Sequence, residues 1–387
     1  MATIIKKLRM SEFGMRVTEK FYPSKKNDPL HKTLLNDAMI RFRNCENKKN
    51  ASQMNQEIEV CRKYWKCYPH HYFTHDLYRE EKELTKNDLI GYIPSFFWYY
   101  LYLPHYRSLK YSLITGNKII TEQFFRGLSI SQPETLCRLM DGKLYSPAMK
   151  VSAFDQVQAD LVVHNYEKLF MKPADGSGGH GIVIFHRTDD GRYVTRDNTF
   201  FTKEFFDALP KKPDYIIQAG IVQDPEISRI YPESVNTCRI ITENKNGTVR
   251  ILCSMLRIGR GRGEVDNASS GGLSIRIDTN NGKFGEFAIS YDGEKYAKHP
   301  DTRFEFRNFT IPRWDEIRNF ALESAGKMPF FTHLGWDIAL TADGPVTVET
   351  NCNPAIDGME MASGGLREAF GIDDPDYYWK NPGKRIQ

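Results

Sequence analysis

Short runs of alternating or continuous apolar residues, separated by turn-forming residues, dominate the chain from about residue 160 onward. Such runs are typical of β-strands, and two helical patterns, near 203–209 and 313–325, lie among them. Strands mixed with a few helices, largely in hairpin order, predict an α+β fold rather than a doubly wound parallel sheet. The expected strands are KLFMKP (168–173), GIVIFHR (181–187), DYIIQAGI (214–221), TCRIITE (237–243), TVRILCSMLRIG (248–259), LSIRID (273–278), GWDIAL (335–340) and VTVETN (346–351).

The first hundred or so residues predict helices and loops, and they are rich in Lys, Arg, Tyr and His. Residues 89–106 carry no Asp, Glu, Lys or Arg, but Pro94 and Pro104 interrupt the stretch, which argues against a membrane span. We expect a buried aromatic helix here, with an interfacial helix in weak peripheral contact with a membrane as the alternative. Further along, NKIITEQFFRG (117–127) predicts a helix with an asparagine cap and a terminal glycine.

The composition is that of an ordinary globular protein. The chain has 53 Lys and Arg against 49 Asp and Glu, and a net charge of +4 over 387 residues is too small to indicate nucleic-acid binding. The seven cysteines are scattered and no export signal is apparent, so we expect reduced thiols in a cytoplasmic protein. One cluster invites a zinc site, but its spacing fits no common zinc finger, so a packed aromatic surface is expected instead. The cluster comprises Cys61, Cys67, His70, His71 and His75.

The segment KPADGSGGHG (172–181) lies between two expected strands and has the small residues of a phosphate-binding loop. Consecutive small residues let backbone N–H groups point into one concavity, which suits phosphate oxygens. A dinucleotide fold would need a helix after the loop and a P-loop would end in GK[ST], and neither is present. The kinase-like arrangement lacks the VAIK, HRD and DFG signatures. Lys172 precedes the glycines by four residues, within reach of a bound phosphate; the alternative is a flexible hairpin with an incidental lysine.

The segment GWDIALTADGPVTVETN predicts a β-hairpin whose two strands carry facing carboxylates. If Leu340 faces Val346, then Asp337 faces Glu349, with Cβ atoms roughly 5 Å apart. Asn351 lies two residues further along and therefore on the same face. Like charges across a sheet destabilise it, so we expect a divalent cation, Mg²⁺ in particular, with a solvated sheet edge as the alternative.

The phosphate lysine, the glycine loop and the C-terminal D…E-x-N hairpin, in this order, resemble the ATP-grasp superfamily. More narrowly, the chain resembles the sugar-transfer associated branch of that superfamily over residues 117–361. The resemblance implies an ATP-grasp fold, in which two β-rich α+β lobes clasp ATP behind a mainly helical N-terminal region. It places the helical region at 1–116, the first lobe at 117–217 and the second lobe at 218–387.

The resemblance also implies roles for individual residues. Lys118, at the start of the expected helix and ahead of LSISQPE, resembles the family's first nucleotide-contacting lysine with its helix and strand, and Lys172 resembles the second. SVNTCRIIT resembles the strand whose arginine, here Arg239, meets the γ-phosphate. The other implied residues are the loop residues Gly176, Ser177, Gly178 and Gly179, the hinge residues Gln218, Ala219, Gly220 and Ile221 beside the adenine, Glu226 near the ribose, and Asp337, Glu349 and Asn351 around Mg²⁺ or Mn²⁺.

The chain departs from many peptide-forming relatives at Gly335, two residues before the hairpin aspartate, where those relatives have arginine. The cation that stabilises the reacting carbonyl must then come from elsewhere, and Arg257 is the candidate. Arg257, Arg260 and Arg262 lie in MLRIGRGRGEVDNASSGG (255–272), between the phosphate arginine and the hairpin. This position favours a cradle for an acidic substrate. The alternatives are a solvated loop and an RG-type patch that binds nucleic acid. No aromatic stacking residues accompany these arginines, which argues against the nucleic-acid patch.

We therefore expect an ATP- and Mg²⁺-dependent carboxylate–amine (or thiol) ligase that works through an acyl phosphate, with Arg239 and Arg257 as catalytic arginines. Its expected partners are a small-molecule or glycan-linked carboxylate and an amine acceptor, in glycan or polysaccharide modification, and no nucleic acid. Two alternatives would use the same ATP site. One is a small-molecule or sugar kinase, and the other is a non-catalytic nucleotide-binding partner of a glycan-assembly complex.

Overall fold

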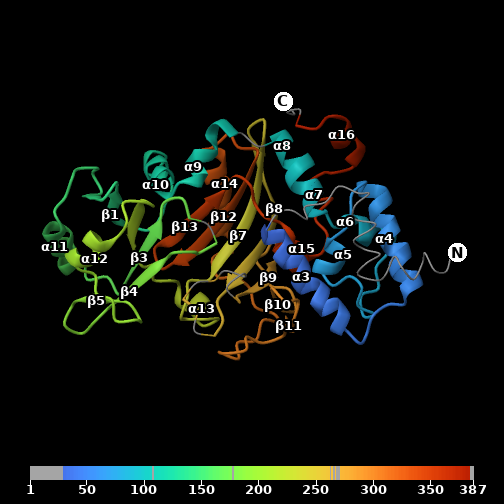
Figure 1. Cartoon of the computed structure of the whole chain (residues 1–387), viewed down its shortest axis with the longest axis horizontal. Helices are drawn as coiled ribbons and strands as arrows, with labels where there is room; N and C mark the ends of the chain where they lie inside the picture. The colour runs from blue at the N-terminus through green and yellow to red at the C-terminus, as the bar shows by residue number, and fades with distance from the viewer. Residues whose placement is uncertain are drawn as a thin grey trace.

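The computed structural model describes residues 29–106, 109–176, 178–261, 263–264, 266 and 271–383. Two antiparallel sheets lie side by side along the long axis of the molecule, and the N-terminal helices pack beyond the second sheet (Figure 1). This architecture confirms the predicted α+β class with a helical N-terminal region. The helices are α3 (Pro29–Asn44), α4 (Ala51–Trp65), α5 (His71–Thr74), α6 (Lys86–Gly91), α7 (Ser95–Phe97), the π-helix η1 (Trp98–Tyr102), α8 (Leu103–Tyr106), the 3₁₀ helix η2 (Leu109–Tyr111), α9 (Ser112–Gly116), α10 (Lys118–Gly127), α11 (Phe154–His164), α12 (Lys203–Ala208), α13 (Pro225–Ser228), α14 (Trp314–Gly326), α15 (Asp357–Ser363) and α16 (Pro375–Lys380).

The first sheet has six strands in the order β2-β1-β6-β3-β4-β5, and α11 and α12 contribute Phe154, Val157 and Phe206 to its core. The sequence pattern predicts no strand before residue 160, whereas β1 and β2 lie there, and β1 rather than LSISQPE is the strand that follows α10. The reason is that β1 is buried along nearly its whole length and encloses a buried Arg138, so it shows no alternation of polar and apolar residues. The strands are β1 (Thr135–Met140), β2 (Lys143–Tyr145), β3 (Lys168–Pro173), β4 (Val183–Arg187), β5 (Tyr193–Val194) and β6 (Tyr215–Ala219).

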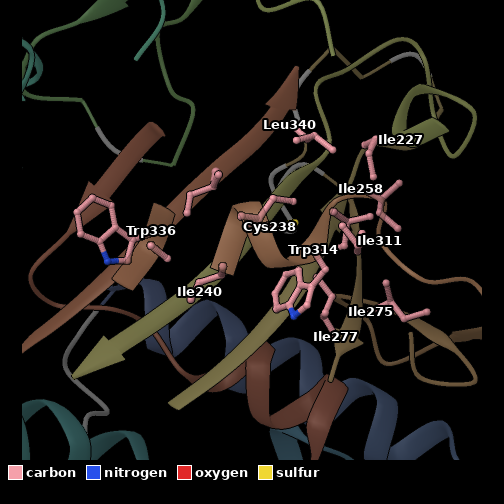
Figure 2. Close-up of a cluster of buried hydrophobic side chains, with 14 of the residues drawn as sticks. Ile227, Cys238, Ile240, Ile258, Ile275, Ile277, Ile311, Trp314, Trp336 and Leu340 are labelled. Atoms are coloured by element: carbon pink, nitrogen blue, oxygen red, sulfur yellow. The ribbon is translucent and has the colours of Figure 1, made fainter. Parts of the chain in front are cut away.

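The second sheet has seven strands in the order β11-β10-β9-β8-β7-β12-β13. A buried hydrophobic cluster lies on each of its faces. On one face, Trp314 and Ile317 of α14 belong to the same buried cluster as Ile240 and Trp336. Figure 2 shows part of this cluster, with Trp314, Ile240 and Trp336 labelled. The next residue of β7, Ile241, points to the opposite face, as the two-residue period of a strand requires. The strands are β7 (Thr237–Lys245), β8 (Thr248–Ile258), β9 (Leu273–Ile277), β10 (Ala288–Ser290), β11 (Lys295–Tyr296), β12 (His333–Thr341) and β13 (Gly344–Asn351).

The N-terminal region docks on that opposite face through aromatic side chains. Trp98 and Tyr102 stack on each other with ring centroids 5.0 Å apart, and the Trp98 indole donates to the carbonyl of Pro354 at 3.0 Å. These contacts confirm the predicted buried aromatic segment at 89–106, although Pro94 divides it into separate helices. None of the helices in the described ranges combines the length and the apolar content that a membrane span needs.

The cluster of Cys61, Cys67 and three histidines is buried among aromatic residues of the same region, as expected. Within the described ranges, no group of three or more His, Cys, Asp or Glu side chains is placed to hold a metal ion. All seven cysteines are free thiols, which agrees with the prediction from their scatter.

Candidate active site

A pocket of about 870 Å³, measured with its open mouth, lies between the two sheets; we call it the inter-sheet pocket. Side chains from β3, β6 and the glycine loop line one side, and side chains from β7, β8, β12 and β13 line the other. The predicted site residues that line it are Lys118, Lys172, Gly176, Gly179, Ala219, Ile221, Arg257, Asp337 and Glu349. Lining residues that the sequence analysis does not single out include Phe170, His180, Ile182, Thr237, Glu264 and Asp266.

The facing carboxylates of the hairpin are confirmed, because Asp337 on β12 pairs with Glu349 on β13. On its other side Asp337 pairs with Arg239 on β7. Three neighbouring strands therefore place an arginine and two carboxylates in one row, and the like charges are directly opposite each other in the sheet.

The turn of the hairpin differs from the expectation. Leu340 pairs with Pro345 instead of Val346, because residues 342–343 alone connect the strands. The register then shifts by one residue at Val348, which forms a β-bulge opposite β12. The shorter turn and the bulge cancel, and so the carboxylates meet in the predicted register.

Two arginines neutralise Asp337. Arg239 donates to both carboxylate oxygens, with Nη2 2.7 Å from Oδ2, and Arg257 Nη1 donates to Oδ2 at 2.8 Å. Burial opposes ionisation of Asp337, but the two guanidinium groups outweigh it and lower its pKa to about 2. The carboxylate is therefore fully ionised at neutral pH.

Glu349 has no hydrogen-bond partner among the described residues, and burial, with Asp337 opposite, raises its pKa. Carboxylate oxygens are hard donors, which Mg²⁺ prefers as ligands. A carboxylate without a hydrogen-bond partner, directly opposite a second carboxylate, is therefore a suitable ligand for Mg²⁺. Asn351 pairs with Gly335 at the end of β13 and does not line the inter-sheet pocket. Asp337 and Glu349 thus form the part of the predicted cation site that the pocket contains.

Both predicted lysines enter the pocket. Lys172, at the end of β3, is buried and donates to Gln218 Oε1 at 3.1 Å. Burial lowers the pKa of Lys172 to about 8, although Glu349 acts in the opposite direction. Lys118 Nζ donates to the carbonyl oxygen of Gly176, and burial lowers its pKa as well. The pocket therefore holds two cations whose charge is poorly solvated.

The helix α10 delivers Lys118 because its first turn is tied to the glycine loop. Asn117 caps the helix, accepting from the amides of residues 119 and 120, and its Nδ2 donates to Asp175 Oδ1 at 2.8 Å. The amide of Lys118 donates to Ala174 O at 2.8 Å. This confirms the predicted cap, and it fixes one lysine relative to the loop that follows the other.

The loop itself needs its glycines. Gly178, Gly179 and Gly181 have φ angles of 65°, 77° and 74°, in the left-handed region that other residues avoid. A Cβ at Gly181 would also lie 3.0 Å from the ring of Pro173. Ser177 lies outside the described residues.

The predicted hinge lies where β6 ends. Ala219 and Ile221 line the pocket, and a Cβ at Gly220 would lie 2.9 Å from the Cβ of Lys168, so the chain must pass close to β3 here. Glu226 lies on α13, half exposed, with its carboxylate 2.7 Å from Arg229, and it does not line the inter-sheet pocket.

The structure separates two of the three arginines that were predicted to act together. Arg257 lines the pocket, whereas Arg260 Nη1 donates to the hydroxyl of Tyr296 at 2.9 Å and does not line it. Arg262 lies outside the described residues. Only Arg257 is therefore placed for the predicted substrate role among the described members of this set.

The sequence analysis missed two acidic residues of the same segment. Asp266 lies 3.3 Å from Arg257 and accepts from the amide of Thr237 at 3.2 Å. Glu264 reaches the first sheet, with a carboxylate oxygen 2.8 Å from His186 Nε2. Both residues lie in the same segment as Arg257, Arg260 and Arg262, but no periodicity in that segment indicates which side chains point inward.

The departure at Gly335 has a steric reason. A Cβ at this position would lie 2.9 Å from the Cβ of Pro354, so no larger side chain fits without displacing the segment that leads to α15. An arginine at this position is therefore sterically excluded.

The two sheets and the pocket that they enclose define an ATP-grasp protein. The model of the family described as sugar-transfer associated ATP-grasp matches residues 100–370, and the chain belongs to this family.

Several solved structures are similar to the chain. They include D-alanyl-alanine synthetase A from Vibrio cholerae (12% identity, TM-score 0.37, 69% of this chain). Two others are an L-amino acid ligase from Bacillus licheniformis (14%, 0.38, 73%) and the biotin carboxylase of Campylobacter jejuni (10%, 0.40, 71%). The chain spans 63%, 51% and 47% of the lengths of these three proteins, less than two thirds of each. No curated protein matches the chain.

Proposed function

We propose that the protein is an ATP- and Mg²⁺-dependent ligase that joins a carboxylate to an amine, or to a thiol, through an acyl phosphate. The observation that carries the proposal is the charge arrangement in the inter-sheet pocket. Lys118 and Lys172 lie on the side of the first sheet, and Asp337 and Glu349 face them from the second. The two lysines can bind the phosphates of ATP, and the two carboxylates can bind a divalent cation.

ATP is proposed to lie across the pocket with its base near the hinge. Phe170, Ile182, Ala219 and Ile221 supply apolar surface there, which suits the faces of a purine. The phosphates would then reach the two lysines and the backbone amides of the glycine loop. Arg239 is proposed to act on the γ-phosphate, as the resemblance implies.

The Glu349 carboxylate, which has no hydrogen-bond partner among the described residues, fits a divalent metal ion. Asp337 and Glu349 would hold Mg²⁺ in the pocket, with Mn²⁺ as an alternative, and the ion would offset negative charge on the phosphates. Asn351, two residues beyond Glu349 on β13, is the third ligand that the resemblance implies, although it does not line the pocket. The chain's own part is then positioning and the exclusion of water from the closed pocket.

The proposed reaction has two steps. A carboxylate oxygen attacks the γ-phosphorus, the bond from that phosphorus to the β-phosphate oxygen breaks, and ADP leaves with those electrons. The amine nitrogen then attacks the acyl carbon, the bond to the phosphate oxygen breaks, inorganic phosphate leaves, and the nitrogen loses a proton to solvent. Arg257, which lines the pocket, is proposed to stabilise the oxyanion of the second step, because Gly335 leaves no room for a cationic side chain at its own position.

The family description, sugar-transfer associated, supports a glycan-linked acid or amine as one substrate. A panel of uronic acids, other acids and amines should be screened for ADP release, followed by mass spectrometry of the products. An amide with ADP supports the ligase. A phosphoester with ADP would instead establish the kinase, and the absence of any turnover across the panel would favour the non-catalytic partner.

A further inference from the structure

The carboxylate of Asp266 is bound inside the inter-sheet pocket by three groups. Its Oδ1 lies 3.3 Å from Arg257 Nη2, and its Oδ2 accepts from the amide of Thr237 at 3.2 Å and from the hydroxyl of the same residue. The side chain of Asp266 is only 13% exposed, and Thr237 and Arg257 are buried. One guanidinium, one amide and one hydroxyl thus satisfy both oxygens of a single carboxylate.

This set of donors has the chemistry of a receptor for a free carboxylate. Planar guanidinium groups and backbone N–H groups are the usual ligands of carboxylates, and the hydroxyl adds a third donor. The guanidinium of Arg257 also donates to Asp337. Asp337 is shared with Arg239, so Arg257 has a carboxylate of its own only in Asp266, and a substrate carboxylate could take that place.

The receptor is placed where the proposed chemistry needs it. The guanidinium of Arg257 contacts both Asp266 and Asp337. A carboxylate bound in place of Asp266 would therefore contact the same guanidinium as Asp337, which belongs to the proposed cation site. The two lysines that suit the nucleotide phosphates are on the other side of the pocket, on α10 and β3.

We infer that Thr237 and Arg257 form the subsite for the carboxylate of the acid substrate, and that Asp266 fills this subsite as an internal stand-in which the substrate must displace. The inference rests on the proposed ligase function and adds a specific location for its acid. It makes Asp266 a competitor of the substrate rather than a support of the active site. Removing it should improve the binding of small carboxylates.

The experiment is a fluorine NMR titration of the full chain with fluoroacetate, a small monocarboxylate that needs no nucleotide. Asp266→Ala is expected to bind fluoroacetate at least about tenfold more tightly than the unaltered protein, because a charge-assisted competitor has gone. Adding Arg257→Ala to this variant should abolish the gain. Asp301→Asn is the matched control: Asp301 accepts from the amide of Gly261 at 2.6 Å, so it holds the same segment outside the pocket. It should leave fluoroacetate binding unchanged.

A second variant guards against a folding defect. Asp266→Asn keeps an acceptor for the Thr237 amide and removes the charge, and thermal unfolding will show whether either variant is folded. It should also bind fluoroacetate more tightly, by a smaller factor. Equal binding by the unaltered protein and by folded Asp266→Asn would overturn the inference.

The other oxyanion that could use the same donors is a phosphate of the nucleotide. If Asp266→Ala bound a non-hydrolysable ATP analogue more tightly and fluoroacetate no better, the donors would belong to the phosphates and the inference would fail. Because fluoroacetate binding requires no turnover, this failure is distinct from that of the ligase proposal. The ligase proposal fails if no acid and amine pair releases ADP, or if the product that accompanies ADP is a phosphoester instead of an amide or thioester.

Discussion

Asp337 and Glu349 face each other across β12 and β13 but have opposite electrostatic surroundings. Asp337 is held by two guanidinium groups, which lower its pKa to about 2. Glu349 has no hydrogen-bond partner among the described residues, and burial raises its pKa. Of the two, Glu349 is the carboxylate that is available to a cation, and its ionised form costs stability until a cation binds.

Glu349→Gln is therefore expected to separate activity from stability. The variant should lose Mg²⁺-dependent ADP formation by about a hundredfold or more, because the ion loses its unshared carboxylate. It should unfold at the same temperature or a higher one, since like charges opposite each other cost roughly 0.2–1 kcal/mol. Asp343→Asn, in the turn of the same hairpin, is the control and should change neither quantity. Near-normal ADP formation by Glu349→Gln in saturating ATP would exclude the metal role.

Lys172→Ala is expected to weaken the binding of a non-hydrolysable ATP analogue by about tenfold or more, since a charge-assisted hydrogen bond is worth roughly 1.5–3 kcal/mol. Calorimetric titration measures this directly. Lys143→Ala, at an exposed position of β2 in the same sheet, is the matched control. An unchanged affinity would leave the glycine loop as a flexible hairpin with an incidental lysine.

The lowered pKa of Lys172 predicts that nucleotide binding takes up protons. Burial lowers its pKa from 10.5 to about 8, and a bound phosphate should raise it again. At about pH 8.5 part of the free protein has a neutral lysine, so binding should protonate it, and affinity should fall as the pH rises further. Calorimetry in two buffers of different ionisation enthalpy detects the uptake. Lys172→Arg, which stays charged, should show less uptake, and equal uptake would assign it to another group.

The stability of the folded state depends on pH in the opposite direction to the affinity for nucleotide. Between about pH 8 and 10.5 the unfolded chain binds more protons at Lys172 than the folded chain does. Without nucleotide, this group therefore makes the folded state more stable as the pH rises through that window.

Arg257→Ala and Arg260→Ala should behave differently, although the two residues are three apart in sequence. Arg257 contacts Asp337 and Asp266 in the pocket, so its loss should lower kcat, as does the removal of a transition-state interaction. It should also raise KM for the acid, because Arg257 belongs to the inferred carboxylate subsite. Arg260 is held by Tyr296 outside the pocket, so its loss should leave kcat and KM unchanged. A raised KM for the acid in Arg260→Ala would instead support the prediction that Arg260 and Arg257 bind the acid substrate together.

Gly335→Ala tests the steric exclusion of a side chain from the hairpin. The added Cβ would lie 2.9 Å from that of Pro354, and we expect the free energy of unfolding to fall by about 1–3 kcal/mol. Gly127→Ala is the control, because a Cβ there meets nothing within 4 Å at the exposed end of α10. It should be neutral or slightly stabilising. Denaturant unfolding of both variants measures the difference.

The hairpin shows how far the sequence could specify the site. Alternation of polar and apolar residues fixed the strands, and the facing pair followed, but the pattern contains no information about turn length or bulges. Here an overlong turn and an overlooked bulge at Val348 compensated each other. The predicted pairing of Asp337 with Glu349 is therefore correct, although the predicted pairing of Leu340 with Val346 is wrong.

Other parts of the site depend on long-range packing that no local pattern encodes. Lys172 could be predicted because it stands beside a glycine loop, whereas Lys118, at the start of a capped helix, was implied only by the family resemblance. Asp266 and Thr237 could not be predicted in either way, since they are brought to Arg257 by the pairing of β7 with β8 and by a segment without periodicity. Arg260 was predicted to join Arg257, but a three-residue separation carries it past the pocket to Tyr296.

The aromatic docking of the N-terminal region has a consequence for any shortened version of the protein. The family match begins at residue 100, inside η1, and a fragment cut there would lose Phe97 and Trp98, both completely buried. It would also lose the carboxylate contact between Glu360 and the amide of Ile93 at 2.9 Å. The N-terminal limit of the family match, at residue 100, therefore lies within a hydrophobic core. A fragment that keeps this core intact has to begin upstream of Ile93 and not at residue 100.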